Sequence, residues 1–101
     1  MINHRRRYVR FEVHSVSPVD EMELTKSIRK NILFLHGEVA LADARFYVNE
    51  YDTDTATGVF HCTLKLLEKV IAAAVLVYSV GNQKVSIQPL KTSGTIKGAK
   101  K

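Results

Sequence analysis

Alternating apolar and polar positions predict four β-strands along this chain of 101 residues. In residues 8–16, Val9, Phe11 and Val13 are apolar at every second position, and side chains at that spacing share one face of a strand. Comparable segments bounded by turn residues recur three more times. Pro89 suggests that the last of these strands lies at an edge of the sheet, because proline donates no backbone hydrogen bond. The predicted strands cover residues 8–16, 44–51, 59–64 and 84–90.

Two segments between these strands are predicted to be helices. The first begins at Asp20, a residue type that caps helix N-termini, and has apolar residues at spacings of three and four. Gly37 would end it, although residues 39–43 could add one more turn. The second helix covers residues 66–80 and ends before Gly81. Its second half has few polar side chains, which fits either a buried helix or a protein interface.

The order of these elements, β-α-β-β-α-β, predicts an α+β fold of the ferredoxin-like type. Right-handed crossovers would place both helices on one face of a four-stranded antiparallel sheet, with the first and third strands at its centre. The fourth strand would then run beside the first. A chain of this length fits one domain, residues 1–101, with a basic N-terminal arm at 1–7 and a basic C-terminal tail at 91–101. We expect the tail to be mobile until it binds a partner.

Charge is unevenly distributed along the chain. All ten acidic side chains lie between Glu12 and Glu68, whereas the two ends carry only basic ones, and the net charge is +5. Because the start of the first strand and the end of the fourth are neighbours in the predicted sheet, Arg5–Arg7 and Lys91–Lys97 should converge into one cationic patch. Such a patch favours a polyanion, above all a nucleic acid, as the partner. The small residues of the tail would let backbone N–H groups approach phosphates closely.

Membrane insertion and secretion are not indicated. The longest apolar run, residues 70–78, is much shorter than the roughly 18 residues that a membrane span needs. No apolar stretch follows Met1, so no secretory signal is predicted. The single cysteine excludes an intramolecular disulfide and fits a reducing compartment. We therefore expect a cytoplasmic protein with no membrane partner.

Residues that could carry catalysis or hold a metal are poorly placed for it. His61 and Cys62 are adjacent, so on a strand they point to opposite faces and cannot act as a base and a nucleophile. The four histidines lack the spacing of metal ligands, and Asp52 and Asp54 lie in a polar turn where solvated carboxylates are ordinary. No glycine-rich phosphate-binding motif is present. We expect no catalytic residue in this chain and no cofactor bound by it.

The face of the sheet that the helices leave uncovered would carry aromatic and cationic side chains. Such side chains can stack on bases and contact phosphates. However, the third strand lacks the paired aromatic residues of the usual RNA-recognition motif, which argues against base readout there. The same face could equally pack against a protein. The side chains predicted to project from it are Tyr8, Arg10, His14, Tyr47, Tyr51 and His61.

A set of short motifs runs through the chain: Arg5-Arg6-Arg7-Tyr8, His36-Gly37 followed by Ala40, Gly58-Val59-Phe60-His61-Cys62, Ala72-Ala73-Ala74 and Ser93-Gly94-Thr95-Ile96-Lys97. In this order and at this spacing they resemble the family of ribonuclease P protein component 2. This is the small archaeal-type subunit shared with eukaryotic ribonuclease P and MRP complexes. The resemblance covers nearly the whole chain. One position departs from it, because His61 stands where the family often has arginine, and a neutral histidine would weaken a phosphate contact.

The resemblance implies an RRM-like sandwich and a role in transfer-RNA processing. In that family the holoenzyme, an endoribonuclease, removes the 5′ leader of precursor tRNA by hydrolysing one phosphodiester bond. Catalysis belongs to the ribonuclease P RNA and its Mg²⁺ ions, while the protein supports the folded RNA and pairs with a second protein subunit of TIM-barrel fold. The RNA contacts that the charge pattern and the resemblance together indicate are Arg5, Arg6, Arg7, Arg10, His61, Lys91, Thr92, Ser93, Gly94, Thr95 and Lys97.

Other functions remain open on the residues alone. An RNA-binding subunit of another ribonucleoprotein would share the basic ends but bind a different RNA. A ferredoxin-like dimerisation or regulatory module would bind no RNA and form a stable homodimer. An acylphosphatase-like hydrolase is disfavoured, because residues 15–18 do not form the glycine-rich anion loop that it would need after the first strand.

Overall fold

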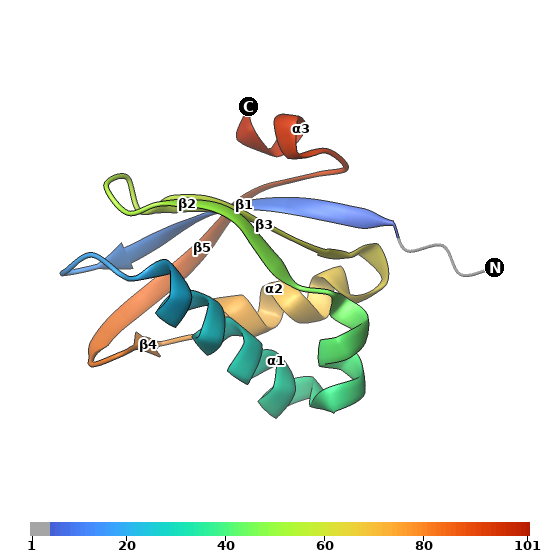
Figure 1. Cartoon of the computed structure of the whole chain (residues 1–101), viewed down its shortest axis with the longest axis horizontal. Coiled ribbons are helices and arrows are strands. Elements are labelled where there is room, and N and C mark those ends of the chain that lie inside the picture. Colours follow the sequence, from blue (N-terminus) through green and yellow to red (C-terminus); the bar gives the residue numbers. More distant parts are fainter. Residues whose placement is uncertain (1–4) are drawn as a thin grey trace.

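The computed structural model describes residues 5–101, in which five antiparallel strands form one sheet with helices on both of its faces (Figure 1). Helices α1 and α2 cover one face, and the short α3 lies on the other. The strand order is β2-β3-β1-β5-β4, which confirms the predicted α+β topology with one strand more than expected. The elements are β1 (Arg6–Ser15), α1 (Glu21–Ala44), β2 (Tyr47–Asp52), β3 (Thr57–Thr63), the 3-10 turn η1 (Leu64–Leu66), α2 (Leu67–Val75), β4 (Ser79–Val80), β5 (Gln83–Ser93) and α3 (Ile96–Lys100).

The hydrophobic core lies between the sheet and the layer formed by α1 and α2. Val9, Phe11 and Val13 of β1 are buried there, as their alternation predicts. Because residues three and four apart share one side of a helix, each helix presents a buried stripe to the sheet. These stripes consist of Leu24, Ile28 and Ile32 in α1 and of Val70, Ala73 and Ala74 in α2.

Helix α1 contains a kink that corrects the predicted end of the first helix. Its start is as predicted, since the Asp20 carboxylate accepts a hydrogen bond from the backbone N–H of Glu23 at 3.2 Å. Gly37 leaves helical geometry with φ 90° and ψ 173°, a conformation open to glycine. The chain then returns to a helical path as far as Ala44, and Arg45 ends it in a left-handed conformation.

Helix α2 ends earlier than the predicted range of 66–80. It covers Leu67–Val75, and Ser79–Val80 form β4 instead of a last helical turn. β4 and β5 make a hairpin whose turn contains Gly81 with φ 61°. A Gly-Asn pair between two apolar segments is typical of a two-residue hairpin, and this local geometry overrides the helical pattern.

Strand β2 contains one extra residue. Val48 pairs with Phe60, and Glu50 pairs with Val59, so Asn49 has no partner of its own in β3. This arrangement is a β-bulge, and it shifts the alternation of every later residue in the strand by one position.

The bulge overturns the prediction that Tyr51 projects from the uncovered face. The Tyr51 ring packs against the core and stacks on Phe11, with ring centroids 6.1 Å apart and an angle of 8° between the planes. Glu50 takes its place on the opposite face. Strict period-two alternation cannot anticipate this exchange, because it assumes an unbroken ladder.

The C-terminal tail, which the sequence predicts to be mobile, is folded. β5 extends from Gln83 to Ser93, and α3 follows directly. Thr95 caps α3, because its Oγ1 accepts a hydrogen bond from the N–H of Gly98 at 3.0 Å. Ala99 is fully buried where α3 packs on β1, β3 and β5. The expectation that the helices lie on one face therefore holds for α1 and α2 but not for α3.

Candidate nucleic-acid interface

A row of aromatic side chains crosses the face of the sheet that α1 and α2 leave uncovered. Tyr47 of β2, His61 of β3 and Tyr8 of β1 are direct partners in neighbouring strands. The His61 ring lies between the two tyrosines, with its centroid 5.6 Å from that of Tyr47 and 5.5 Å from that of Tyr8. Tyr8 also pairs with Ser93, so this aromatic row (Tyr47, His61, Tyr8) reaches the tail.

His61 is held in place at the centre of the aromatic row. It is only 9% exposed, and its Nδ1 lies 3.0 Å from Oδ1 of Asn49. Because an amide oxygen can only accept, Nδ1 carries the proton and Nε2 remains an acceptor. Burial, followed by the positive charge of Arg6, lowers the pKa of His61 below its usual value. His61 is therefore neutral at pH 7 and offers a ring rather than a charge.

Strand alternation divides the arginines at the start of β1 between two faces. Arg6 shares the face of His61, on which its charge acts. Arg7 pairs with Cys62, which belongs to the opposite face. Its guanidinium reaches the tail, where Nη1 lies 3.7 Å from the place that a Cβ on Gly94 would occupy.

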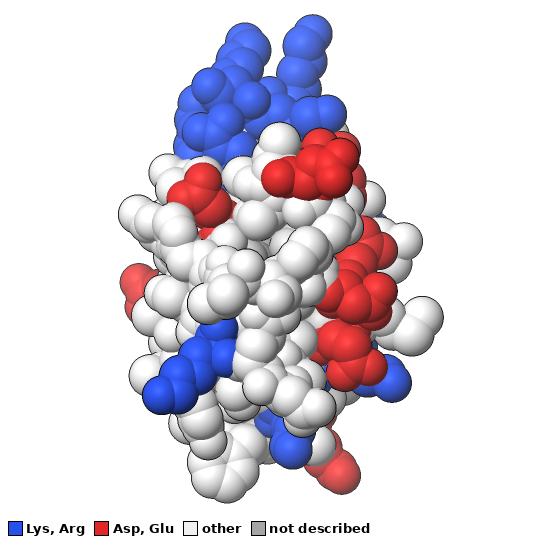
Figure 2. Space-filling model, turned by 90° about the vertical axis from the view of Figure 1, so that its left-hand side faces the viewer, with Lys and Arg blue, Asp and Glu red and all other residues white. Residues whose placement is uncertain are grey.

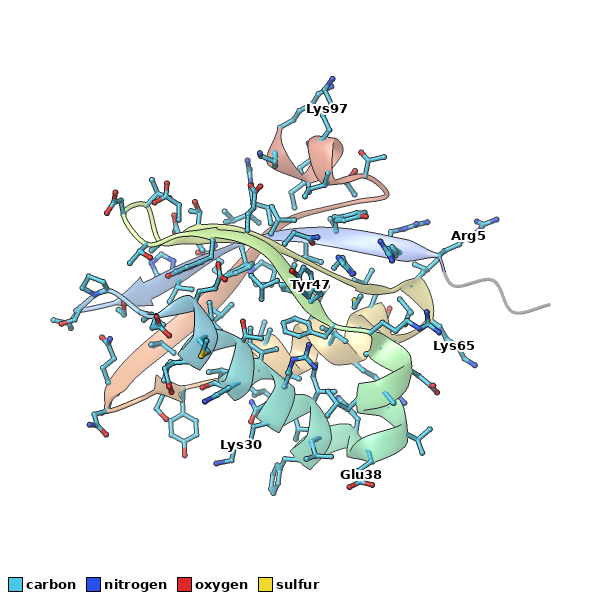
Figure 3. The ribbon with its side chains drawn as sticks, in the orientation of Figure 1. Arg5, Lys30, Glu38, Tyr47, Lys65 and Lys97 are labelled. Atoms are coloured by element: carbon cyan, nitrogen blue, oxygen red, sulfur yellow. The ribbon has the colours of Figure 1, made fainter. Side chains whose placement is uncertain are left out.

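The predicted convergence of the two basic ends is confirmed close to the sheet and fails farther out. Arg10 and Lys91 are partners in neighbouring strands. Arg5, at the start of β1, and Lys97, on α3, instead point in different directions (Figure 3). The single predicted patch is thus two groups of cations, one at the start of β1 and one on α3. Residues 1–4 of the N-terminal arm lie outside the described residues.

Lysines gather at the end of the molecule that α3 forms. Lys97, Lys100 and Lys101 are exposed, and Figure 2 shows basic side chains covering this end while acidic ones lie along the body below it. Folding of the tail into α3 concentrates charges that a mobile tail would spread. A dense group of exposed cations attracts polyanions.

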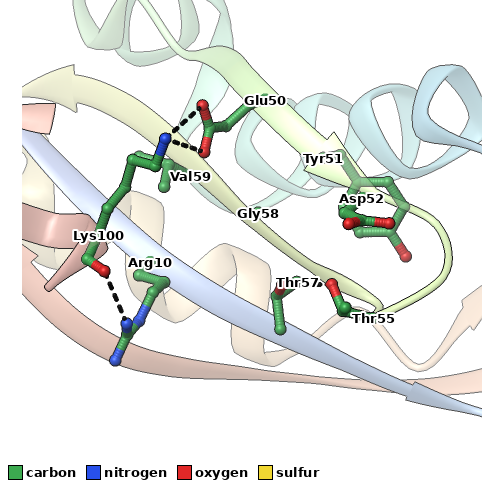
Figure 4. Close-up of a pocket in the computed structure, with 9 residues that line it drawn as sticks. All are labelled: Arg10, Glu50, Tyr51, Asp52, Thr55, Thr57, Gly58, Val59 and Lys100. Carbon is green, nitrogen blue, oxygen red and sulfur yellow. Dashed lines mark hydrogen bonds and ion pairs between the residues drawn. The ribbon is translucent and has the colours of Figure 1, made fainter. Parts of the chain in front are cut away.

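A groove of about 380 Å³ lies between the end of α3 and the hairpin of β2 and β3. Nζ of Lys100 is 3.2 Å from Oε1 and 3.4 Å from Oε2 of Glu50 (Figure 4). Nη1 of Arg10 donates a hydrogen bond to the backbone oxygen of Lys100 at 3.3 Å. Both cations have partners within the chain, and Asp52 adds a further negative charge to the lining. The groove suits a polyanion less well than the exposed ends, and Arg10 anchors α3.

The small residues of the tail mainly contact one another. Oγ of Ser93 accepts a hydrogen bond from the N–H of Thr95 at 3.3 Å, and Thr95 in turn caps α3. Lys91, Thr92 and Gly94 are exposed. The tail therefore presents a lysine, a threonine and glycine backbone to a partner, while two predicted contact hydroxyls stabilise its turn.

Cys62 lies in the core, on the face opposite His61, as the alternation predicts. Burial raises the pKa of the Cys62 thiol to about 12, so the thiol stays protonated and is a poor nucleophile. Among residues 5–101, no group of three or more His, Cys, Asp and Glu side chains could hold a metal ion. No helix in the same part of the chain combines the length and apolar character needed to cross a membrane.

Two residues of this surface escaped the sequence analysis. Asn49 reaches His61 because it is the extra residue of a bulge, and a bulge leaves no clear pattern in an edge strand. Lys100 meets Glu50 only because the tail folds back onto the sheet. The one local signal for that folding is Thr95, a good capping residue ahead of a short helix.

Comparison with known proteins confirms the resemblance seen in the sequence. Residues 7–101 match the model of the Rpp14/Pop5 family. The chain is 37% identical over 97 residues to ribonuclease P protein component 2 of Aeropyrum pernix, covering 94% of this chain and 79% of that protein. Its counterpart in Pyrococcus furiosus is 31% identical over 97 residues, with 96% and 81% covered.

The fold has a counterpart among solved structures. A chain in the cryo-EM structure of yeast ribonuclease MRP superposes with a TM-score of 0.73 at 8% identity, over 94% of this chain and 78% of that one. At so low an identity the match bears on the fold alone. Together with the family match over residues 7–101, it leads to one conclusion: the chain belongs to the Rpp14/Pop5 family.

Proposed function

We propose that this chain is a protein subunit of ribonuclease P, which binds and stabilises the catalytic RNA that removes the 5′ leader from precursor tRNA. The observation that carries this role is the similarity, along nearly the whole chain, to proteins named ribonuclease P protein component 2. The exposed cations at the start of β1 and on α3 support it, because a folded RNA brings phosphates close together and neutralising them releases counterions.

The exposed cations around the aromatic row are the RNA contacts in this assignment. Arg5 and Arg6 are exposed, and Arg7 reaches the tail, so the start of β1 can follow a phosphate backbone. Arg10 acts on RNA indirectly by fixing α3. His61, being neutral, contributes its ring and the Nε2 acceptor. The remaining contacts come from Lys91, Thr92, Ser93, Gly94, Thr95 and Lys97.

Hydrolysis itself is assigned to the RNA with its Mg²⁺ ions, in the cytoplasm. This chain contributes electrostatic support, because cations placed along the RNA lower the repulsion between its phosphates and favour its compact form. Its one thiol is buried and protonated, so Cys62 takes no part in the chemistry.

A protein partner is assigned to the outer side of the helical layer. Phe34 and Val39 of α1 are largely exposed, and so is Tyr78 between α2 and β4. Large apolar side chains on an accessible surface often mark an interaction site. We assign this side to the TIM-barrel protein subunit of the holoenzyme, which leaves the opposite face of the sheet and α3 for RNA.

The test is to purify the tagged chain gently from its own cell and to sequence the RNA that accompanies it. Enrichment of ribonuclease P RNA over ribosomal RNA is the expected result. Enrichment of a different RNA would instead indicate another ribonucleoprotein. A stable homodimer without any RNA would indicate a dimerisation module. Either of these two results would overturn the assignment.

A further inference from the structure

We propose that the aromatic row of Tyr47, His61 and Tyr8 binds an unpaired RNA base by stacking. This site rests on the proposed function and adds the kind of RNA that the sheet recognises. Bases within a duplex are stacked on one another and closed to such a surface, whereas bases in loops and at ends can lie on aromatic rings. Stacking tolerates different bases, because every base has a flat π-face.

The rings of the aromatic row are accessible and already ordered. Tyr47 is 56% exposed and belongs to β2, the outermost strand on its side of the sheet, so a base can approach it from the edge. His61 is fixed from the side by Asn49. A surface that is ordered before its ligand arrives loses little conformational freedom on binding.

The charges near the aromatic row suit RNA. Arg6 lies on the same face as the rings, close enough for its charge to act on His61. Lys97 is exposed on α3. The acidic residue that follows the row in β2, Glu50, is neutralised by Lys100. A phosphate backbone that carries a stacked base would therefore meet cations.

Helix α3 limits the size of the site. It covers the neighbouring part of the same face, where Val59 is only 2% exposed although it is not part of the hydrophobic core. The row itself crosses three adjacent strands, so its outer strands lie roughly 10 Å apart, which is room for about one or two bases. A short unpaired segment fits this space better than a long strand.

The missing signature of the usual RNA-recognition motif does not exclude stacking here. That signature consists of paired aromatic residues within the third strand, where His61 is the only ring facing this side. In the fold, the rings come from three different strands, and the register of the ladders brings them together. Inspection of any one strand misses them.

Two short oligonucleotides of equal length and charge provide the test, one an oligoadenylate and the other the same backbone without bases. The chain has four tyrosines and no tryptophan, so quenching of tyrosine emission reports a base placed on these rings. We expect the oligoadenylate to bind about tenfold more tightly than the abasic strand. Tyr47→Ala should remove this preference, and Tyr47→Phe should keep it.

Tyr78→Ala is the matched control. Tyr78 is 79% exposed beside α1, on the helical side of the molecule, so its loss should leave the preference unchanged. Equal affinity for the two strands would overturn the stacking site, as would a Tyr47→Ala variant that unfolds at the same temperature and keeps the preference. In both cases the face would be left for a protein partner.

Failure of this site and failure of the proposed function give different results. A chain that captures ribonuclease P RNA from its cell yet shows no preference for bases keeps the subunit role, carried by its cations, and loses the stacking site. A chain that captures none of this RNA loses the subunit role. In that case a preference for the oligoadenylate would still identify the aromatic row as a site for unpaired bases.

Discussion

Arg10 holds the last turn of α3 by donating a hydrogen bond from Nη1 to the backbone oxygen of Lys100, 3.3 Å away and ninety residues farther along the chain. The side chain of Lys100 adds a second attachment through Glu50. The position of the cations on α3 therefore depends on an arginine that the charge pattern alone assigns to RNA. Binding of RNA and folding of the tail are coupled through this residue.

Arg10→Ala is expected to release α3 from the sheet. The variant loses a hydrogen bond with a charged donor, which at this partly exposed position is worth about 1 kcal/mol of folding stability. Hydrogen exchange should become faster at the amide of Ala99, whose N–H bonds to Thr95 in the folded tail. Glu50→Gln is the control, since it breaks only an exposed ion pair and should have a smaller effect. Unchanged exchange at Ala99 in Arg10→Ala would show that α3 is held by other contacts.

Replacing Arg5, Arg6 and Arg7 together with alanine should weaken RNA binding and leave the fold intact. Each lost phosphate contact reduces the slope of log K against log salt concentration by about 0.7 to 0.9. The measurement is a series of binding constants at increasing salt. The control removes three exposed lysines from the helical layer, and it should leave the slope unchanged: Lys26, Lys30 and Lys69. An unaltered slope in the arginine variant would contradict the role of these cations.

The pKa of His61 should rise when Arg6 is replaced by alanine. Burial is the larger cause of its depressed pKa, so the pKa should remain below the ordinary value of about 6.5. Because the unfolded chain takes up this proton more readily, His61 lowers folding stability as the pH falls below that value. The His61 ring resonances, followed by NMR as the pH changes, give its pKa directly. Arg7→Ala is the control, because Arg7 points to the other face; an equal rise in both variants would refute the division of these arginines.

Gly98→Ala should displace α3. A Cβ at this position would collide with Oγ of Ser93 and crowd Oγ1 of Thr95, both of which hold the turn before the helix. Overpacking of this kind costs about 1 to 3 kcal/mol, which thermal unfolding can measure. Gly94→Ala is the matched control, because the nearest atom there, in Arg7, leaves ordinary space. Equal stability of the two variants would mean that the tail does not pack as described.

The sequence could predict the elements whose pattern is local. Val9, Phe11 and Val13 alternate because β1 has one buried face, and the adjacency of His61 and Cys62 is enough to place them on opposite sides. The central position of β1 follows from the topology. For the same reason, the order of the elements alone is enough to expect that Arg10 and Lys91 lie close together.

The features that the sequence could not predict depend on contacts between distant residues. α3 is short, and its burial depends on β1, β3 and β5 rather than on its own composition. The apolar segment that contains Val77 and Val80 suits a helix or a strand, and the turn at Gly81 decides between them. Arg6 and Arg7 look equivalent in the sequence, yet they act on different faces once β1 is formed.

Asn49 gives a single position unusual influence over the edge strand β2. Deleting it would restore the regular ladder, bring Tyr51 out of the core, turn Glu50 inward away from Lys100 and take from His61 the amide that holds it. The loss of one residue would thus affect the core, the anchor of α3 and the aromatic row at once. When relatives are aligned, a gap at this position is consequently equivalent to a change of surface, and residues that follow it should be compared by the face they occupy rather than by their column.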